Sequence, residues 1–354
     1  MQHGVKRKHW SDAELREKEA QDEAKIATYR QLTKLVLDHR QQYDDTSFTN
    51  TTTLLTLNPE FYTIWNIRRE ILEHWGLDTD KVKRHLAEDL KMVMAMLKRF
   101  PKCYWVWNHR RWCLLSLKDD ANWEKEFALV SMLLDLDIRN FHGWQYRRFV
   151  VSQIELGQRP EQQLATDLKE FEYTTLKISG NISNFSAWHN RSQLIPKIIT
   201  RVHELNVTDQ PMFSDPEKLM ANELELVTTG MYMDSSDTSV WTYLQWLVTD
   251  PLLVTELKQR GVYETILRDQ LAKVKELDDL ELDENGKHDV WCLKSMVLIT
   301  ALLNREAQRP IVDENITEWL NLLVELDPQR HQRYRDQLSG RNPVISTTPT
   351  SVTS

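Results

Sequence analysis

The side chains best placed to do chemistry in this sequence are arginines that follow tryptophans by one helical turn. Residues three apart share a helix face, so each guanidinium lies near its Trp and can bond to carbonyls of an adjacent helix end or stack on an aromatic ring. Four such Trp-x-x-Arg phrases occur: Trp65 with Arg68, Trp107 with Arg110, Trp144 with Arg147 and Trp188 with Arg191. Weaker repeats of the phrase begin at Trp241 and Trp291.

We interpret most of these Trp and Arg side chains as architecture, because chemistry rarely needs the same group in every repeat. Successive tryptophans of the six are 42, 37, 44, 53 and 50 residues apart. That period is too long for one helix and fits a pair of antiparallel helices repeated along a solenoid. The 34-residue tetratricopeptide repeat is disfavoured, because its Trp-x-x-Leu-Gly pattern is absent.

Other chemistry-bearing patterns are weak. Cys103, Cys113 and Cys292 show no CxxC spacing, which predicts a reducing compartment, no disulfide framework and no cysteine zinc site. The sequence contains no glycine-rich phosphate loop, Ser-His-Asp set or HExxH. The segment 281–286 is similar to a calcium loop, but Cys292 stands where an EF-hand needs Glu, so we predict a solvated turn.

Hydrophobic periodicity and capping residues predict an all-α protein without strands. Ser11 and Glu14 form a potential capping box, and Pro59 follows Asn58 as a helix start. The predicted helices span residues 11–43, 59–76, 80–99, 104–117, 123–136, 141–155, 160–179, 185–202, 216–231, 238–249, 251–277, 288–304, 312–325 and 328–338.

The predicted organisation is a flexible segment 1–10, one helical array 11–338 and a disordered Ser/Thr/Pro-rich tail 339–354. The net charge of −8 argues against a general nucleic-acid binder. No run of 18 apolar residues is present, which predicts no transmembrane helix. The basic N-terminus has no apolar segment behind it, so we predict no secretory signal and a cytoplasmic location.

The ordered phrases resemble the α subunit of protein prenyltransferases, which repeats helical hairpins with Trp-x-x-Arg at the head of the second helix. The resemblance covers about residues 10–338 and implies a right-handed crescent of hairpins, an α–α superhelix. Within the family, the chain is most similar to the Rab geranylgeranyltransferase α subunit, in a compact form without immunoglobulin-like or leucine-rich domains. Three segments carry that similarity: 3–8, 181–192 and 223–227.

This resemblance implies a heterodimer with a β subunit, whose barrel would hold the zinc and the lipid pocket. The complex would transfer geranylgeranyl from geranylgeranyl diphosphate to C-terminal cysteines of Rab GTPases, which an escort protein would present. This chain would bind no metal or other cofactor by itself. It would supply part of the diphosphate site and the docking surface for the escort protein.

The resemblance also implies three residues on the diphosphate side of that site. Lys102 and Tyr104 stand five and three residues before Trp107, and His142 stands two before Trp144, as in the family. Departure of diphosphate develops negative charge, which an ammonium and a hydroxyl donor stabilise at a dry interface. The structural alternative is a surface lysine, a packed tyrosine and a packed histidine.

Trp105 and His3 bear on the type of enzyme. In relatives that modify CaaX sequences, a Gln at the position of Trp105 binds the peptide carboxylate, whereas Trp has only one N–H donor. The N-terminus of Rab-type α subunits can reach the zinc of the β subunit, which makes His3 a speculative ligand although Gln2 shifts its register. The alternative functions are a non-catalytic helical-repeat scaffold and the α subunit of a CaaX farnesyl or type I geranylgeranyl transferase.

Overall fold

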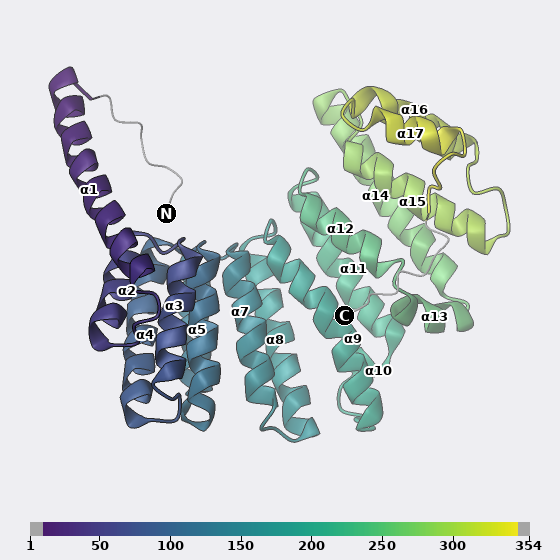
Figure 1. The fold of residues 1–354 in the computed structure, drawn as a ribbon. Coiled ribbons are helices and arrows are strands. Elements are labelled where there is room, and N and C mark those ends of the chain that lie inside the picture. The colour runs from purple at the N-terminus through teal and green to yellow at the C-terminus, as the bar shows by residue number, and fades with distance from the viewer. Residues whose placement is uncertain (1–9, 346–354) are drawn as a thin grey trace. The chain divides into compact units, whose positions relative to one another are not determined.

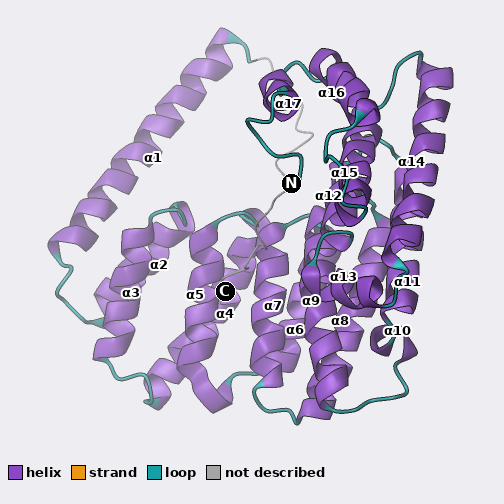
Figure 2. Ribbon diagram, turned by 90° about the vertical axis from the view of Figure 1, so that its right-hand side faces the viewer, coloured by secondary structure: helices purple, strands orange, loops and turns teal. Residues whose placement is uncertain are grey.

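The structure is a computed structural model that describes residues 10–345. Every regular element within this range is a helix, as Figure 2 shows by its single helix colour. The prediction of an all-α protein built from repeated hairpins is therefore confirmed. The chain divides into two compact units, residues 1–154 and 155–354, and each is described here by itself.

The first unit consists of α1 followed by helices that lie side by side (Figure 1). Helix α1 extends away from the others, and Val36 near its end is its buried residue. Helices α2 and α3 pack as one hairpin, and α4 and α5 pack as the next. The bounds are α1 Asp12–Asp38, α2 Asp45–Leu57, α3 Tyr62–His74, α4 Asp80–Arg99, α5 Tyr104–Leu117, η1 Lys118–Asp120, α6 Trp123–Leu136 and α7 Phe141–Glu155.

The second unit continues the hairpin pattern. The pairs α8 with α9, α11 with α12, α14 with α15 and α16 with α17 pack against each other, and α12 also contacts α9 and α15. The bounds are α8 Pro160–Gly180, α9 Phe185–Glu204, α10 Pro211–Ser214, α11 Pro216–Met233, α12 Thr238–Leu247, α13 Pro251–Gln259, α14 Tyr263–Asn285, α15 Val290–Glu306, α16 Glu314–Leu326 and α17 His331–Leu338.

Local capping chemistry explains where many helices begin. Ser11 and Glu14 make the predicted capping box, with Ser11 N–H donating to the Glu14 carboxylate at 2.8 Å. The side chains of Asp44 and Thr79 accept from backbone N–H groups in the first turns of α2 and α4. Because these signals are local, the predicted bounds of α4, α5, α6 and α7 agree with the structure.

Two parts of the helix prediction are wrong, and the short helix α10 was also not predicted. Helix α2, which lies between the expected first and second helices, was not predicted. Thr51, Thr52 and their neighbours give the segment weak helix propensity. The helix is therefore stabilised by packing of the buried Phe48 and Leu54. The predicted single helix 251–277 is divided into α13 and α14. Gly261 lies between them at φ +74°, a left-handed conformation that ends a helix.

The cores of both units are lined by tryptophans of the repeated phrases and by aliphatic side chains at helical spacing. Trp65 and Leu55 in the first unit and Trp188 and Ile195 in the second are at most 1% exposed. None of the helices within residues 10–345 has the length and apolar character needed to cross a bilayer. Ile345, which follows α17, is also buried.

Gly230 marks a close approach of helices in the second unit. A Cβ there would lie 2.8 Å from Ile182 Cδ1 and 2.9 Å from Val240 Cγ2. We expect Gly230→Ala to lower the free energy of unfolding by about 1–3 kcal/mol, because the added methyl overpacks the core. Gly180→Ala is the matched control, since no atom lies within 4 Å of its Cβ position. Equal urea midpoints for wild type and Gly230→Ala would contradict the prediction.

Candidate functional site

The repeated tryptophans fix the turn before each second helix. In five of the six, the indole N–H donates to the carbonyl oxygen six residues earlier, from Trp65 to Pro59 at 2.8 Å and from Trp107 to Pro101 at 2.9 Å. Trp144, Trp188 and Trp241 repeat the bond at 2.6 to 2.9 Å. The bond satisfies the indole donor and a turn carbonyl together, so it holds the residues at the head of the second helix in place.

Three arginines of the phrases reach buried carboxylates on the next hairpin. Arg68 of α3 makes two parallel bonds to Asp89 of α4, at 2.8 and 2.5 Å. Arg110 pairs with Glu126 at 2.5 and 2.8 Å, and Arg191 with Glu223 at 2.6 and 2.7 Å. These bidentate pairs are almost fully buried. Each therefore couples one hairpin to its successor with a defined register.

The guanidinium groups also make the contacts that their place on the helix predicts. Arg68 lies over the Phe48 ring at 3.7 Å and donates to the Phe48 carbonyl at 3.1 Å. Arg191 lies over Phe171 at 3.7 Å. Arg147 lies over the Phe127 ring at 4.3 Å, donates to Ser131 Oγ at 2.7 Å and is 3% exposed. Stacking and hydrogen bonding together satisfy the buried cations.

A third side chain completes each carboxylate site, and it stands two residues after the Trp of the same hairpin. Tyr146 donates its hydroxyl to Glu126 at 2.8 Å, and Tyr243 donates to Glu223 at 2.6 Å. Burial raises the pKa of both phenols, and the adjacent carboxylates raise it further. His109 takes the same place beside Asp89. This residue pattern was missed in the sequence, although the shared position after Trp is a visible signal.

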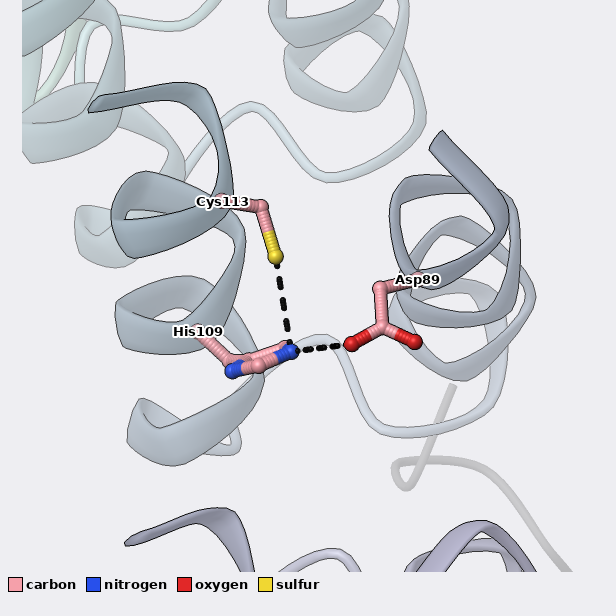
Figure 3. A group of neighbouring side chains, drawn as sticks. All are labelled: Asp89, His109 and Cys113. Carbon is pink, nitrogen blue, oxygen red and sulfur yellow. Dashed lines mark hydrogen bonds and ion pairs between the residues drawn. The ribbon is translucent and has the colours of Figure 1, made fainter. Parts of the chain in front are cut away.

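His109, Asp89 and Cys113 form a buried group with donor atoms within 4.8 Å of one another (Figure 3). His109 Nε2 lies 2.8 Å from Asp89 Oδ2 and 3.4 Å from Cys113 Sγ. Arg69 Nε donates to Nδ1 at 3.3 Å, so a neutral imidazole with its proton on Nε2 satisfies both sides.

This group is not a suitable metal centre or nucleophile. Both oxygens of Asp89 already accept from Arg68, and Arg69 brings a second positive charge to His109. Burial raises the pKa of the Cys113 thiol well above its usual range, which keeps it neutral. A catalytic zinc needs an open coordination position, whereas all three residues are buried.

The charge state of His109 predicts a pH dependence of stability. Burial lowers its pKa to about 4, so between about pH 6.5 and pH 4 the unfolded chain binds a proton that the folded chain does not. We expect stability to fall by about 2 kcal/mol between pH 7 and pH 5. Urea unfolding measures it. In His109→Gln, which can keep both hydrogen bonds without titrating, this component should disappear; an unchanged pH slope in the variant would refute the assignment.

Lys102, Tyr104 and His142 lie together at one edge of the first unit, where the turns precede the second helices α3, α5 and α7. We call this the turn edge. The rings of Tyr104, the first residue of α5, and His142, the second of α7, meet edge to face with centroids 4.2 Å apart. Tyr104 is 54% exposed, whereas His142 is 5% exposed. Lys102 is about half exposed, and its Nζ lies 3.8 Å from the Asp137 carboxylate. The structure thus brings the three predicted residues into one neighbourhood.

Asn140 joins the two turns that carry these residues. Its Nδ2 donates to the Pro101 carbonyl at 3.0 Å, and its Oδ1 accepts from the His142 backbone N–H at 3.1 Å. The side chain is buried. It therefore links the turn before Lys102 to the first turn of α7, which fixes the distance between Tyr104 and His142. Asn140 and Asp137 were not predicted, although Asn140 precedes Trp144 by four residues and reads as a helix cap.

This edge carries hydrogen-bond donors together with charges of both signs. Burial lowers the pKa of His142; the nearby Glu60 acts in the opposite direction, and the positive charge of Lys102 lowers it further. The imidazole is therefore neutral near pH 7. Lys102 lines a cavity of about 660 Å³ together with Lys98, Glu60 and Asp137. An ammonium, a phenol and a neutral imidazole side by side can donate hydrogen bonds to a leaving anion.

Three further positions were singled out in the sequence: Trp105, the segment 281–286 and His3. Trp105 is partly buried and lies against Tyr62, with ring centroids 5.2 Å apart. The prediction of a turn at 281–286 is wrong: α14 continues as helix through Asn285, and Gly286 ends it at φ +68°. His3 lies outside the described residues.

Comparison with known proteins agrees with the geometry. The sequence profile of the Protein prenyltransferase alpha subunit repeat matches residues 44–75, 86–117, 123–154, 167–198 and 220–250. A Candida albicans protein named Geranylgeranyl transferase type-2 subunit alpha is 44% identical, and the alignment covers 98% of this chain and 100% of that protein. A Saccharomyces cerevisiae protein of the same name is 36% identical over 94% of this chain and 97% of that protein.

The mammalian relatives are longer. The rat protein named Geranylgeranyl transferase type-2 subunit alpha is 35% identical over 70% of this chain, and the match spans 41% of its own length. The solved structure described as Candida albicans protein geranylgeranyltransferase-I complexed with GGPP has a TM-score of 0.58 at 19% identity, covering 90% of this chain and 91% of that one, which indicates a shared fold. The chain therefore belongs to the protein prenyltransferase alpha subunits, among the type-2 geranylgeranyl transferases.

Proposed function

We propose that this chain is the α subunit of a Rab geranylgeranyltransferase. The complex transfers geranylgeranyl from geranylgeranyl diphosphate to C-terminal cysteines of Rab GTPases, with an escort protein that presents the substrate, and the product is a thioether. The observation that carries the proposal is the 44% identity to a type-2 α subunit over 98% of this chain. A cytoplasmic location follows from the substrates.

The partner is a β subunit that docks on the turn edge of the hairpins. In the first unit, the residue three before each Trp is an aromatic side chain that is more than half exposed: Tyr62, Tyr104 and Phe141. Leu57 and Leu136, the last residues of α2 and α6, also lie at this edge, and their exposed fractions are 55% and 73%. Such a run of large apolar side chains is typical of a protein interface.

The residues of this chain act on the diphosphate at that interface. Lys102 contributes a mobile ammonium, since its contact with Asp137 is long and partly exposed. Tyr104 contributes a phenol held against His142. Docking of the partner excludes water from the edge, and hydrogen bonds to the developing charge on the leaving diphosphate become stronger in the drier site.

The zinc that activates the substrate thiol belongs to the β subunit. Within residues 10–345, the group Asp89, His109 and Cys113 is the one grouping with the right donors, and its closed environment does not fit an open catalytic zinc. Bound zinc lowers the pKa of a coordinated thiol and so supplies a thiolate nucleophile.

The test is reconstitution of the chain with its β subunit, followed by transfer assays with geranylgeranyl diphosphate. We expect a one-to-one complex that modifies a Rab GTPase in the presence of escort protein and leaves a CaaX peptide unmodified. Efficient CaaX transfer would favour the farnesyl or type I alternative, which Trp105 disfavours because it lacks the acceptor and amide groups of Gln. A metal-free monomer without partner would favour the scaffold alternative.

A further inference from the structure

A second cavity lies in the second unit, far along the chain from Lys102. It has a volume of about 210 Å³ and is formed by α12, α15, α16 and α17 together with the segment that follows α17. The volume is about that of seven water molecules, and the cavity is open to solvent on one side. No residue of the proposed diphosphate site lines it.

Positive charge gathers at this cavity, although the whole chain has a net charge of −8. Lys294, Arg330 and Arg333 line it, and the adjacent carboxylate is that of Asp327. Asp327 accepts from Lys294 at 2.9 Å and from Arg330 at 3.1 Å. Arg333 has no ion pair among the described residues, so the site holds three cations against one carboxylate and attracts an anion.

Two buried polar side chains of the lining lack partners. Ser295 is 7% exposed and Gln337 is 6% exposed, and neither side chain forms a hydrogen bond within the described part of the chain. The polar atoms of these two side chains are not among the fully buried ones, so a hydroxyl and an amide beside three cations remain open to bond the acceptor atoms of a ligand. Trp241, Thr242 and Gln245 of α12 also line the cavity.

Much of the remaining lining is apolar. Leu320 and Leu323 are fully buried, and Trp291 stacks on Lys294 with its ammonium 4.5 Å from the ring centroid. Val344, in the segment after α17, lies against the same cavity, and Ile345 next to it is buried. A bare phosphate would gain little from these walls, whereas an acidic residue flanked by apolar side chains would use both the charge and the apolar surface.

We propose that this cavity binds an acidic residue and its apolar neighbour from an extended peptide segment of a partner protein. The carboxylate is held by Arg333 and Lys294 with hydrogen bonds from Ser295 and Gln337, and the apolar side chain packs on the half-buried Trp291 and Val344. The inference does not rest on the proposed function, because none of these residues belongs to the turn edge with Lys102.

The test uses the full chain, in complex with its β subunit where one is required, and the blocked peptide acetyl-Gly-Leu-Glu-Leu-Gly-amide. Calorimetry is run with wild type, Arg333→Ala and the matched control Arg335→Ala, which removes an exposed arginine from the same helix outside the cavity. We expect binding that weakens about tenfold in Arg333→Ala and with added salt, and that is unchanged in Arg335→Ala. A Gln-for-Glu peptide should bind about tenfold more weakly.

The opposite results each overturn the proposal. Equal binding of the Glu and Gln peptides would make the cavity an apolar pocket only. Inorganic phosphate that binds as tightly as the peptide would make it a phosphate site. An equal loss of peptide affinity in Arg335→Ala would show that general surface charge, and not this cavity, accounts for binding. If the peptide does not bind the wild-type chain at all, the proposed site does not exist.

Discussion

Replacing Arg191 by Met is expected to lower the free energy of unfolding by about 3–5 kcal/mol, among the largest effects of any single substitution in this chain. Arg191 is 1% exposed and its partner Glu223 is 0% exposed. Methionine keeps most of the side-chain volume but leaves the carboxylate of Glu223 buried with only neutral donors. The cost therefore comes from an uncompensated buried charge rather than from a cavity.

The neighbours of this pair strengthen the expectation. Arg191 also donates to Thr174 and Thr175 at 3.1 and 2.7 Å, and Tyr243 donates to Glu223 at 2.6 Å. Three helices, α8, α9 and α11, thus meet at one guanidinium, and α12 joins through Tyr243. Loss of the cation disturbs every member of the network at once.

Urea unfolding of the purified chain measures the effect, and two further variants interpret it. Arg260→Met removes an exposed arginine paired with Asp215 and Glu256, so we expect little or no change in the free energy of unfolding. The double variant Arg191→Met with Glu223→Leu removes both charges and should recover most of the loss. A double variant as unstable as the single one would show that packing, rather than the buried charge, dominates.

The hairpin architecture could be predicted because its signals are local. Trp at the head of each second helix, capping residues such as Thr79 and proline breaks such as Pro101 specify helix ends within a few residues. Helix α2 was not predicted because threonine side chains compete with the helix for backbone hydrogen bonds. The hydroxyls of Thr49, Thr53 and Thr56 donate to carbonyls four residues earlier. Its stability comes from packing, which a local pattern does not record.

The partners of the arginines could not be predicted, because they lie at variable distances along the chain. Arg110 and Glu126 are 16 residues apart, whereas Arg191 and Glu223 are 32 apart. Loop lengths between hairpins differ, so sequence spacing does not identify the acid. The place of Tyr146 and Tyr243, two after Trp, is constant in the sequence, but its meaning appears only once the carboxylate is seen.

The candidate site was found through position in the repeat rather than through its own chemistry. Lys102 and Tyr104 would be ordinary surface residues if they stood outside the Trp107 phrase. What the sequence could not supply is the link across hairpins, where Asn140 bonds Pro101 and the His142 backbone. This contact depends on how α7 packs beside α5, and it explains why residues 38 positions apart along the chain, Tyr104 and His142, share one edge.

In the reconstituted complex, Lys102→Ala is expected to lower the rate of geranylgeranyl transfer about 10²- to 10³-fold at saturating lipid, the usual effect of removing one donor to a developing anion. The variant should fold normally, because the partly exposed contact of Lys102 with Asp137 at 3.8 Å contributes at most about 1 kcal/mol. Single-turnover kinetics with geranylgeranyl diphosphate and Rab substrate separate this loss from weaker lipid binding.

Lys118→Ala is the matched control, since Lys102 stands just before α5 and the exposed Lys118 just after it. Its transfer rate should equal that of wild type. Lys102→Arg keeps the positive charge and should restore part of the rate, because the charge rather than the shape of the ammonium stabilises diphosphate. If Lys102→Ala instead transfers at the wild-type rate with saturating lipid, the lysine serves the partner interface or the surface, and other groups hold the anion.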